Sequence, residues 1–182
     1  MKINKAVLAA LVGAAVGLVA VGVAAAGSGG RTDIGVAMKA TAQFHAVAVA
    51  EKHHYGLLRD AKGIACIDMT GMPEMGAMGI HYANGALVKD PAINAGTPEA
   101  LVYQPLAHGK LQLVAVEYVV LKAAWDAKHS SPPSLFGQKF NFTPAGNRFG
   151  LPAYYSLHAW LWKHNPSGEF SMWNPTVSCP KA

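Results

Sequence analysis

Three polar side chains stand by themselves in apolar stretches that are typical of β-strands. They are His81 in IHYANGAL, Glu117 in LQLVAVEYVVL and His158 in YYSLHAWLWKH. If the three strands are neighbours in one antiparallel sheet, these side chains converge on one face, because alternate residues of a strand share a face. Two imidazoles and a carboxylate with one open position form a site for zinc, copper or non-haem iron. The sequence therefore predicts a transition-metal site, with copper and zinc as the first candidates.

Three roles are open to the lone carboxylate. An acidic side chain in an apolar strand is costly to bury unless it is paired, and an unpaired one takes up a proton. Glu117 would therefore pair with a basic side chain, orient or protonate a histidine, or bind a metal directly. A lone buried histidine, equally, can be satisfied by a backbone carbonyl or a carboxylate. The chain has no HExxH, CxxC or CxxCH ligand signature, so these patterns do not decide whether the site is catalytic.

A second group of histidine and methionine side chains could add to such a site. Soft thioethers bind copper(I), and methionines recur at every third residue from 69 to 78 in a Gly-rich stretch. The alternative is that these methionines fill irregular gaps in the core. The second-rank ligand candidates are His45, His164 and Met78.

A tryptophan-rich face offers a different function. In a strand from Tyr154 to His164 the side chains alternate, so Trp160 and Trp162 would share a face with His158. Together with Trp173 they could line an apolar pocket for a flat ligand, or they could pack as ordinary core beneath a helix. The rival to metal binding is therefore a non-metal module that binds a small ligand or a partner through these three tryptophans.

The elements that would position these residues form an α+β domain. Thr41–Leu58 carries apolar residues at helical spacing and is the main predicted helix. Ala100–Gln104 and Leu111–Leu121 are strand-like runs joined by Pro and Gly, as in a hairpin. Ser130–Arg148 is a long segment rich in Ser, Pro and Gly that could form one wall of a site. The expected fold is a mixed or antiparallel sheet of about five strands with one main N-terminal helix packed on it.

The N-terminal 26 residues are typical of an export signal. Lys2 and Lys5 precede an uncharged apolar run, Ala6–Ala26, which ends in small residues. Because this run approaches the roughly 20 residues that span a bilayer, an uncleaved membrane anchor is the alternative. The predicted organisation is residues 1–26 as signal peptide or anchor, 27–40 as a linker and 41–182 as a single disulfide-closed domain. That domain is expected to be secreted or periplasmic.

Cysteine content and charge agree with an exported domain that binds no nucleic acid. The two cysteines, Cys66 and Cys179, are predicted to pair as a disulfide, because an oxidising compartment favours paired thiols. The net charge is +5, and no cluster of Lys or Arg accompanies the aromatic residues. A nucleic-acid groove needs such a cluster. Contact with a membrane is expected only through an uncleaved N-terminal segment, and the sequence indicates no particular protein partner.

Five segments spread over the whole exported body carry a resemblance to other proteins. They are FHAVAVAEKHHYG, GAMGIHYANGAL, KLQLVAVEYVV, SLFGQ and LHAWLWKHNPSGEFSMWNPTVSC. On these segments the chain from Thr41 to Cys179 resembles a family of uncharacterised secreted bacterial proteins. The resemblance implies export and a single domain, and it transfers no catalytic residue, since no activity is established for that family.

Overall fold

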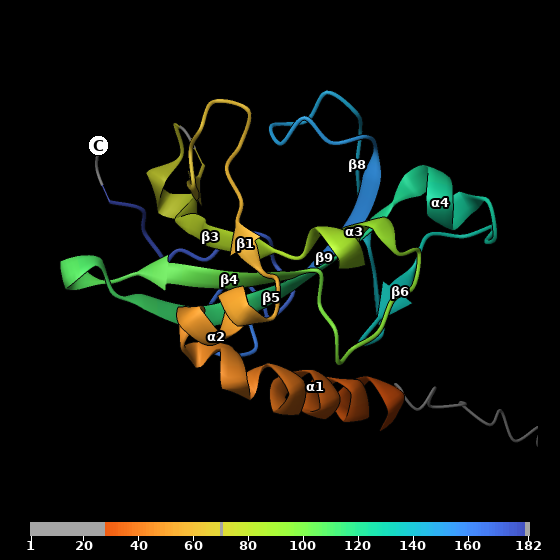
Figure 1. The fold of residues 1–182 in the computed structure, drawn as a ribbon, viewed down its shortest axis with the longest axis horizontal. Helices are drawn as coiled ribbons and strands as arrows, with labels where there is room; N and C mark the ends of the chain where they lie inside the picture. Colours follow the sequence, from red (N-terminus) through yellow and green to blue (C-terminus); the bar gives the residue numbers. More distant parts are fainter. Residues whose placement is uncertain (1–27, 70, 181–182) are drawn as a thin grey trace, which may run out of the picture.

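A computed structural model describes residues 28–69 and 71–180 of the chain, and the predicted signal peptide lies outside these described residues (Figure 1). Its centre is a seven-stranded antiparallel sheet in the order β1-β3-β4-β5-β9-β8, with β2 also paired to β3. The predicted fold class, α+β with one main N-terminal helix, is confirmed, although the sheet has more strands than expected. Its strands are β1 (Gly56–Leu57), β2 (Cys66–Asp68), β3 (Ala77–Ala83), β4 (Ala100–Pro105), β5 (Leu111–Leu121), β8 (Asn141–Thr143) and β9 (Tyr154–Ala159).

Short helices and a separate hairpin join these strands. The hairpin consists of β6 (Ser134–Leu135) and β7 (Gln138–Lys139). Asn84 caps α3 with its side chain, which accepts from the amides of Ala86 and Leu87, so the Asn-Gly pair begins a helix rather than a hairpin turn. The helical segments are α1 (Ser28–Thr41), η1 (Ala42–His45), α2 (Val47–Lys52), η2 (Pro73–Met75), α3 (Gly85–Lys89), η3 (Ala107–Gly109) and α4 (Lys122–Asp126).

Strand β5 is the centre of the sheet because its apolar, β-branched sequence can be buried on both faces. Every residue from Leu113 to Val120 is buried. The strand pairs with β4 on one side and with β9 on the other. The predicted hairpin of Ala100–Gln104 with Leu111–Leu121 is confirmed. Strand β9 is shorter than the predicted Tyr154–His164 and ends at Ala159.

The two faces of the sheet are covered differently. On one face α1, η1 and α2 pack against the main core, which includes Leu101, Tyr103, Val116 and Tyr118. Figure 1 shows these helical segments along one side of the sheet and two long loops, residues 58–65 and 144–153, rising from the other side. A smaller apolar cluster around Trp160 and residues of the C-terminal segment is separate from the main core. The candidate metal ligands His81, Glu117 and His158 lie on the face away from the helices.

Helix α1 corrects the prediction for the N-terminal part of the domain. The segment expected as a linker, 27–40, is helical from Ser28, and the helix ends at Thr41, where the predicted one begins. Ile34, Ala37, Met38 and Thr41 occur at helical spacing and face the protein. The glycines of this segment indicated a linker, so the helical spacing of these residues was not recognised in the sequence. The predicted helix Thr41–Leu58 is instead a 3₁₀ turn followed by α2, which ends at Lys52 ahead of β1.

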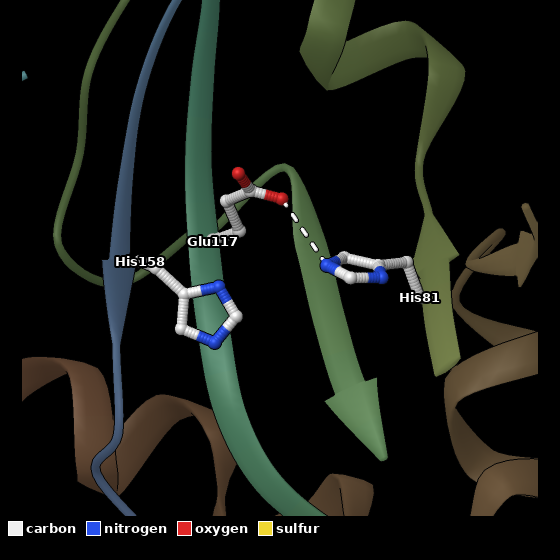
Figure 2. Close-up of side chains that lie close together, drawn as sticks. All are labelled: His81, Glu117 and His158. Atoms are coloured by element: carbon white, nitrogen blue, oxygen red, sulfur yellow. Dashed lines mark ion pairs between the residues drawn. The ribbon is translucent and has the colours of Figure 1, made fainter. Parts of the chain in front are cut away.

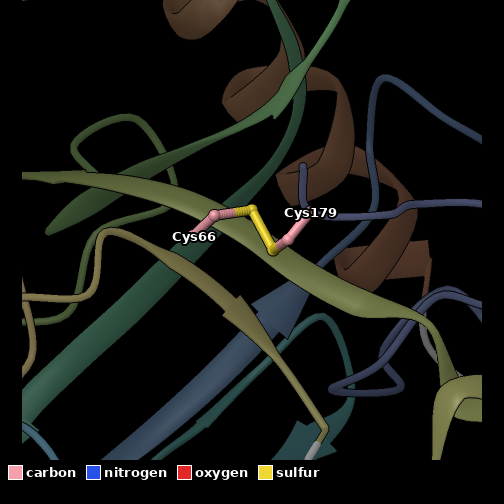
Figure 3. Close-up of a disulfide and its surroundings, with 2 residues drawn as sticks. All are labelled: Cys66 and Cys179. Carbon is pink, nitrogen blue, oxygen red and sulfur yellow. A yellow bond between two sulfur atoms is a disulfide. The ribbon is translucent and has the colours of Figure 1, made fainter. Parts of the chain in front are cut away.

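The predicted disulfide between Cys66 and Cys179 is present (Figure 3). Cys66 lies on β2 opposite Ile80 of β3, so the bridge fastens the C-terminal segment beside the strand that carries His81. A second link is a β-bridge between Ala77 and Asn174. In the part of the chain that the structure describes, no helix has the length and apolar character needed to cross a membrane.

Candidate metal centre

The three predicted metal ligands come from three strands of the one sheet. Glu117 of β5 lies directly opposite His158 of β9, and on its other side opposite Ala100 of β4. His81 of β3 is two strands away from Glu117, about 10 Å from strand to strand. On the intervening strand β4, Ala100 lies opposite Glu117 and Val102 lies opposite His81, so the two polar side chains approach each other diagonally across β4. The structure therefore brings the predicted group together.

The side chains of this cluster are close enough to share one ion. One ligand atom from each of His81, Glu117 and His158 can be chosen so that all three atoms lie within 4.8 Å of one another. Nε2 of His81 is 3.4 Å from Oε2 of Glu117, the contact that is dashed in Figure 2. The two imidazole rings lie with centroids 6.1 Å apart and nearly perpendicular planes. Figure 2 shows both rings and the carboxylate extending from their strands toward a common space.

The cluster is buried, and the ring nitrogens of its histidines make no hydrogen bonds. His81, Glu117 and His158 are 1%, 8% and 3% exposed. All four ring nitrogens of His81 and His158 are buried without a hydrogen-bond partner. Buried polar atoms are nearly always satisfied, and leaving one unsatisfied typically costs about 1–3 kcal/mol. A metal ion held by the three side chains could supply the missing partner for some of these atoms.

Burial sets the charge state of these groups. Desolvation lowers the pKa of His81 to about 4, with a further lowering by the charge of Arg148 and a weaker opposing contact from the Gly79 backbone. Desolvation, assisted by His81, also holds the pKa of His158 well below its usual range. Both imidazoles are therefore neutral at pH 7, the form that binds metal.

The pKa of the Glu117 carboxyl group is shifted in the opposite direction, upward. Desolvation raises the pKa of Glu117 to about 7, against a lowering by a hydrogen bond from the Ser156 side chain. Because burial keeps the His81 imidazole neutral, the close contact between His81 and Glu117 is not an ion pair in the metal-free protein. A metal ion that replaced the carboxyl proton would provide the positive charge that the pair lacks.

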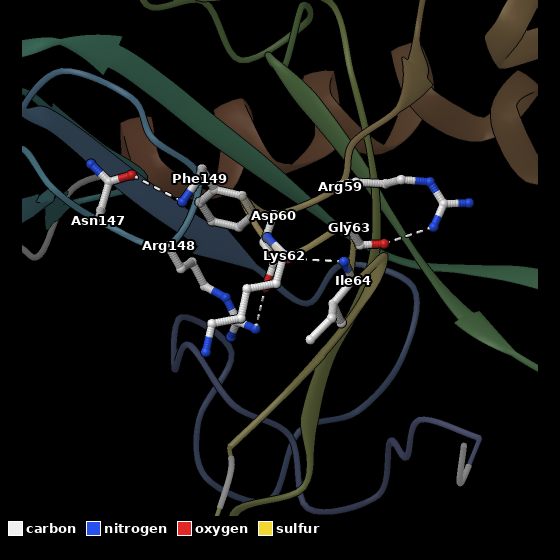
Figure 4. A network of polar contacts seen from close by, with 8 residues as sticks. All are labelled: Arg59, Asp60, Lys62, Gly63, Ile64, Asn147, Arg148 and Phe149. Atoms are coloured by element: carbon white, nitrogen blue, oxygen red, sulfur yellow. Dashed lines mark hydrogen bonds and ion pairs between the residues drawn. The ribbon is translucent and has the colours of Figure 1, made fainter.

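Two loops cover the cluster from the side opposite the helices. Phe149 packs edge-on against His81, with ring centroids 6.3 Å apart. Its loop is held to the 58–65 loop by an ion pair of 3.1 Å between Arg148 and Asp60 (Figure 4). A hydrogen bond from the Ala61 amide to the Arg148 carbonyl also joins the two loops. Asp60 in turn accepts hydrogen bonds from the amides of Lys62 and Ile64. The cover is thus fastened by polar contacts at its outer edge.

Beside the cluster lies an apolar cavity of about 420 Å³. Its size is within the roughly 300–1,000 Å³ of small-molecule sites. Glu117 forms part of its wall, and the remaining described lining is apolar except for Tyr154, which carries a hydroxyl group, and Lys89, an exposed residue of α3. The walls include Leu58, Val88, Val119, Phe149, Leu151 and Tyr154. The cavity therefore reaches the cluster at its carboxylate.

The second-rank ligand candidates lie outside the cluster. His45 is exposed and packs edge-on against Trp162, with ring centroids 4.5 Å apart. His164 is exposed, and its backbone carbonyl accepts a hydrogen bond from Asn174. Met78 is buried on β3, about 10 Å of strand before His81. Of the other methionines in its series, Met72 and Met75 are exposed.

The three tryptophans do not share one of the cavities described. Trp160 and Trp162 line a cavity of about 590 Å³ with His164, whereas Trp173 lines another, of about 410 Å³, with Asp60. Trp160 donates a hydrogen bond to the Ser171 carbonyl, and Trp162 donates one to Thr41 beneath α1. The expected alternation ends with β9 at Ala159, so Trp162 packs on the helix side while His158 does not. Trp160 and Trp162 are therefore anchored by structural hydrogen bonds.

Some residues of the site were not predicted from the sequence. Ala100 and Val102 lie on β4 between the strands of Glu117 and His81, and apolar residues in strands carry no chemical signal. Phe149 and Arg148 lie at the end of the long Ser130–Arg148 loop, which was expected to form a wall, but their partners His81 and Asp60 are far away in the sequence. Ser156 could have been noticed, since it is two residues before His158 and so shares its face of β9.

Comparison of the chain with protein-family models, curated proteins and solved structures finds no match in any of the three. The class of protein that can be stated is therefore a structural one: an antiparallel α+β domain with a buried His81, Glu117 and His158 group that could hold a metal.

Proposed function

We propose that this protein is an exported transition-metal-binding protein whose site consists of His81, Glu117 and His158. The observation that carries the proposal is the set of four buried, unpartnered ring nitrogens on two histidines beside a buried carboxylate. Purely structural histidines would be expected to hydrogen-bond to protein groups. The disulfide between Cys66 and Cys179 supports export, because such bonds persist in oxidising compartments.

Zinc is the first choice among the metals, with copper(II) as the alternative. Zinc bonds to imidazole nitrogen and carboxylate oxygen are about 2.0–2.2 Å long, so two ligand atoms of a tetrahedral site lie about 3.3–3.5 Å apart. The 3.4 Å between His81 and Glu117 already has this value. His158 would have to approach by rotation of its side chain, since ligand atoms of the cluster are up to 4.8 Å apart. Three protein ligands leave one position of the metal open.

Metal content and affinity test this proposal directly. The full chain, purified without an affinity tag from the compartment to which it is exported, is analysed for metals before and after dialysis against a chelator. Calorimetric titration of the stripped protein with Zn²⁺ and Cu²⁺ is then repeated on His158→Ala, Glu117→Gln and, as a control, His164→Ala. The control removes an exposed histidine outside the cluster.

The expected result is one equivalent of metal and a loss of affinity of about 100-fold in His158→Ala, with His164→Ala unchanged. Glu117→Gln is expected to weaken binding as well, because the amide carries no charge. Metal binding that His158→Ala and Glu117→Gln leave intact would disprove the site, and the absence of any tight binding would disprove the function.

A further inference from the structure

The cavity beside the cluster has an unusual distribution of polarity. In the described lining, the residues that carry polar side-chain groups are Glu117, the exposed Lys89 and Tyr154 with its hydroxyl. The rest of the wall is apolar. Val119 and Leu121 follow Glu117 on the same face of β5, and Phe149 and Leu151 come from the covering loop. An apolar chamber of this size favours the hydrocarbon part of a small molecule over water.

The charge of a metal ion bound beside Glu117 indicates which polar group the bound small molecule would carry. With a divalent ion, the two neutral imidazoles and the single carboxylate would leave one positive charge uncompensated in a buried place. A buried charge is costly unless it is paired. The open position of the metal would therefore favour an anionic oxygen ligand.

We propose that the cavity binds an apolar monocarboxylate, such as a fatty or aryl carboxylate, with its hydrocarbon part against Val119, Leu121 and Leu151 and its carboxylate on the metal. This inference rests on the proposed metal site. Glu117, which belongs to both the cluster and the cavity wall, fixes the end at which the carboxylate binds. The hydrocarbon part provides most of the affinity, and the metal provides the selection for an anion.

The test compares ligands that differ in one part only. The zinc-loaded full chain is titrated calorimetrically with octanoate, with acetate, which has the same head and almost no hydrocarbon, and with octanol, which has no charge. The same titrations use Val88→Trp and Leu151→Trp, which fill the cavity from two partly exposed wall positions. Leu106→Trp, at an exposed residue outside the cavity, is the control.

Octanoate is expected to bind at least about 100-fold more tightly than acetate, because six more methylene groups leave water. Each wall variant is expected to weaken octanoate binding by at least about tenfold, which is the effect of losing roughly two buried methylenes. Zinc affinity, acetate binding and thermal unfolding should stay as in Leu106→Trp, and this shows that a wall variant is folded.

The outcomes separate the two proposals. If zinc binds but octanoate is no tighter than acetate, or if neither folded wall variant weakens octanoate, the cavity inference is wrong and the metal site stands. If octanol binds as tightly as octanoate, the chamber is apolar but the carboxylate selection is wrong. If zinc itself does not bind, both proposals fail, and this is known before any carboxylate is added.

Discussion

At the scale of single residues, the cluster combines side chains in states that a folded protein normally avoids. His81 and His158 are neutral and buried, and their ring nitrogens make no hydrogen bond, although Nε2 of His81 lies 3.4 Å from Oε2 of Glu117. Glu117 carries a raised pKa. Each feature makes the metal-free protein less stable and makes the group a better metal ligand. The sign of the effect of removing a histidine on stability therefore distinguishes a binding site from a structural core.

Replacement of His158 by leucine is expected to stabilise the metal-free protein while it abolishes metal binding. Two unsatisfied buried nitrogens are removed, each of which costs about 1–3 kcal/mol, and a side chain of similar size fills the space. Chemical denaturation of chelator-treated His158→Leu measures the change, with His164→Leu as the exposed control. A loss of stability in His158→Leu relative to that control would show that the imidazole supports the fold by itself.

A second buried acid predicts a dependence of stability on pH. Glu99 directly precedes β4, and burial raises its pKa to about 8. Its Oε2 accepts a hydrogen bond from the Val119 amide of β5. The folded protein therefore keeps a proton that the unfolded chain releases above about pH 4.3. Stability is highest below that pH and falls by up to about 1.4 kcal/mol per pH unit as pH rises toward 8.

Glu99→Gln keeps an oxygen that can accept from Val119 but cannot ionise, so it should flatten this decline. Glu117 contributes a similar slope up to about pH 7 in both proteins. Its effect therefore cancels in the comparison, and the stability difference between Glu99→Gln and the unmodified chain should grow with pH and be largest at pH 8. Urea denaturation midpoints from pH 5 to pH 8 measure it, with Glu74→Gln on the surface as control. Parallel pH curves for the two variants would contradict the assignment.

At the scale of elements, the strands that carry the cluster were largely predictable and their cover was not. β4 and β5 have apolar, β-branched sequences with Pro and Gly between them, so periodicity and turn chemistry agree. The convergence of His81, Glu117 and His158 followed from their central positions in three such strands. Helix α1 was missed because its glycines suggested a linker, and the cover depends on the contact of Asp60 with Arg148, for which local sequence holds no signal.

Arg148→Ala is expected to loosen the loop that covers the cluster. The change removes the ion pair to Asp60, while the Asp60 contacts to Lys62 and Ile64 remain. Amide hydrogen exchange in residues 147–151 should accelerate by roughly fivefold, the scale of one exposed ion pair. Arg59→Ala is the matched control, since its guanidinium bonds only to the Gly63 carbonyl among the recorded contacts.

Acid should have the same effect as the Arg148 substitution. The hydrogen bond from the Ile64 amide has the largest effect on the pKa of Asp60. Together with Arg148 and the Lys62 amide it holds this pKa below its usual range, against the raising effect of burial. The stabilisation by ionised Asp60 is thus complete above about pH 4 and is lost as pH falls through the lowered pKa. Exchange in residues 147–151 that is indifferent to both acid and Arg148→Ala would show that the loop is held otherwise.

At the scale of the whole molecule, the disulfide connects the beginning and the end of the domain. Cys66 precedes β3, and Cys179 belongs to the C-terminal segment, whose Val177 packs in one apolar cluster with Trp160. The segment has little regular structure of its own, and it is attached through the bridge, the Asn174 contacts and this small apolar cluster. The bridge therefore limits how far the C-terminal segment can separate from the sheet.

Loss of the disulfide is expected to lower stability substantially. The bridge spans 113 residues, and closing a loop of this length contributes about 4–5 kcal/mol on the chain-entropy estimate. For a domain of this size the melting temperature should fall by roughly 10–20 °C. The melting temperatures of the Cys66→Ser, Cys179→Ser double variant and of the reduced unmodified chain, each compared with the oxidised unmodified chain, measure the change. A melting temperature that is the same with and without the bridge would contradict this account.

The order in which the ligands occur along the chain determines the stage of folding at which the metal site is complete. His81 and Glu117 lie on strands that neighbour β4, whereas His158 is on β9, which joins the sheet after a long intervening segment. A slip of one residue in the pairing of β9 would turn His158 to the helix side. Only a chain with its last long strand in register therefore presents all three ligands. A bound ion would therefore stabilise only the completed sheet, so it would slow unfolding and would not speed folding.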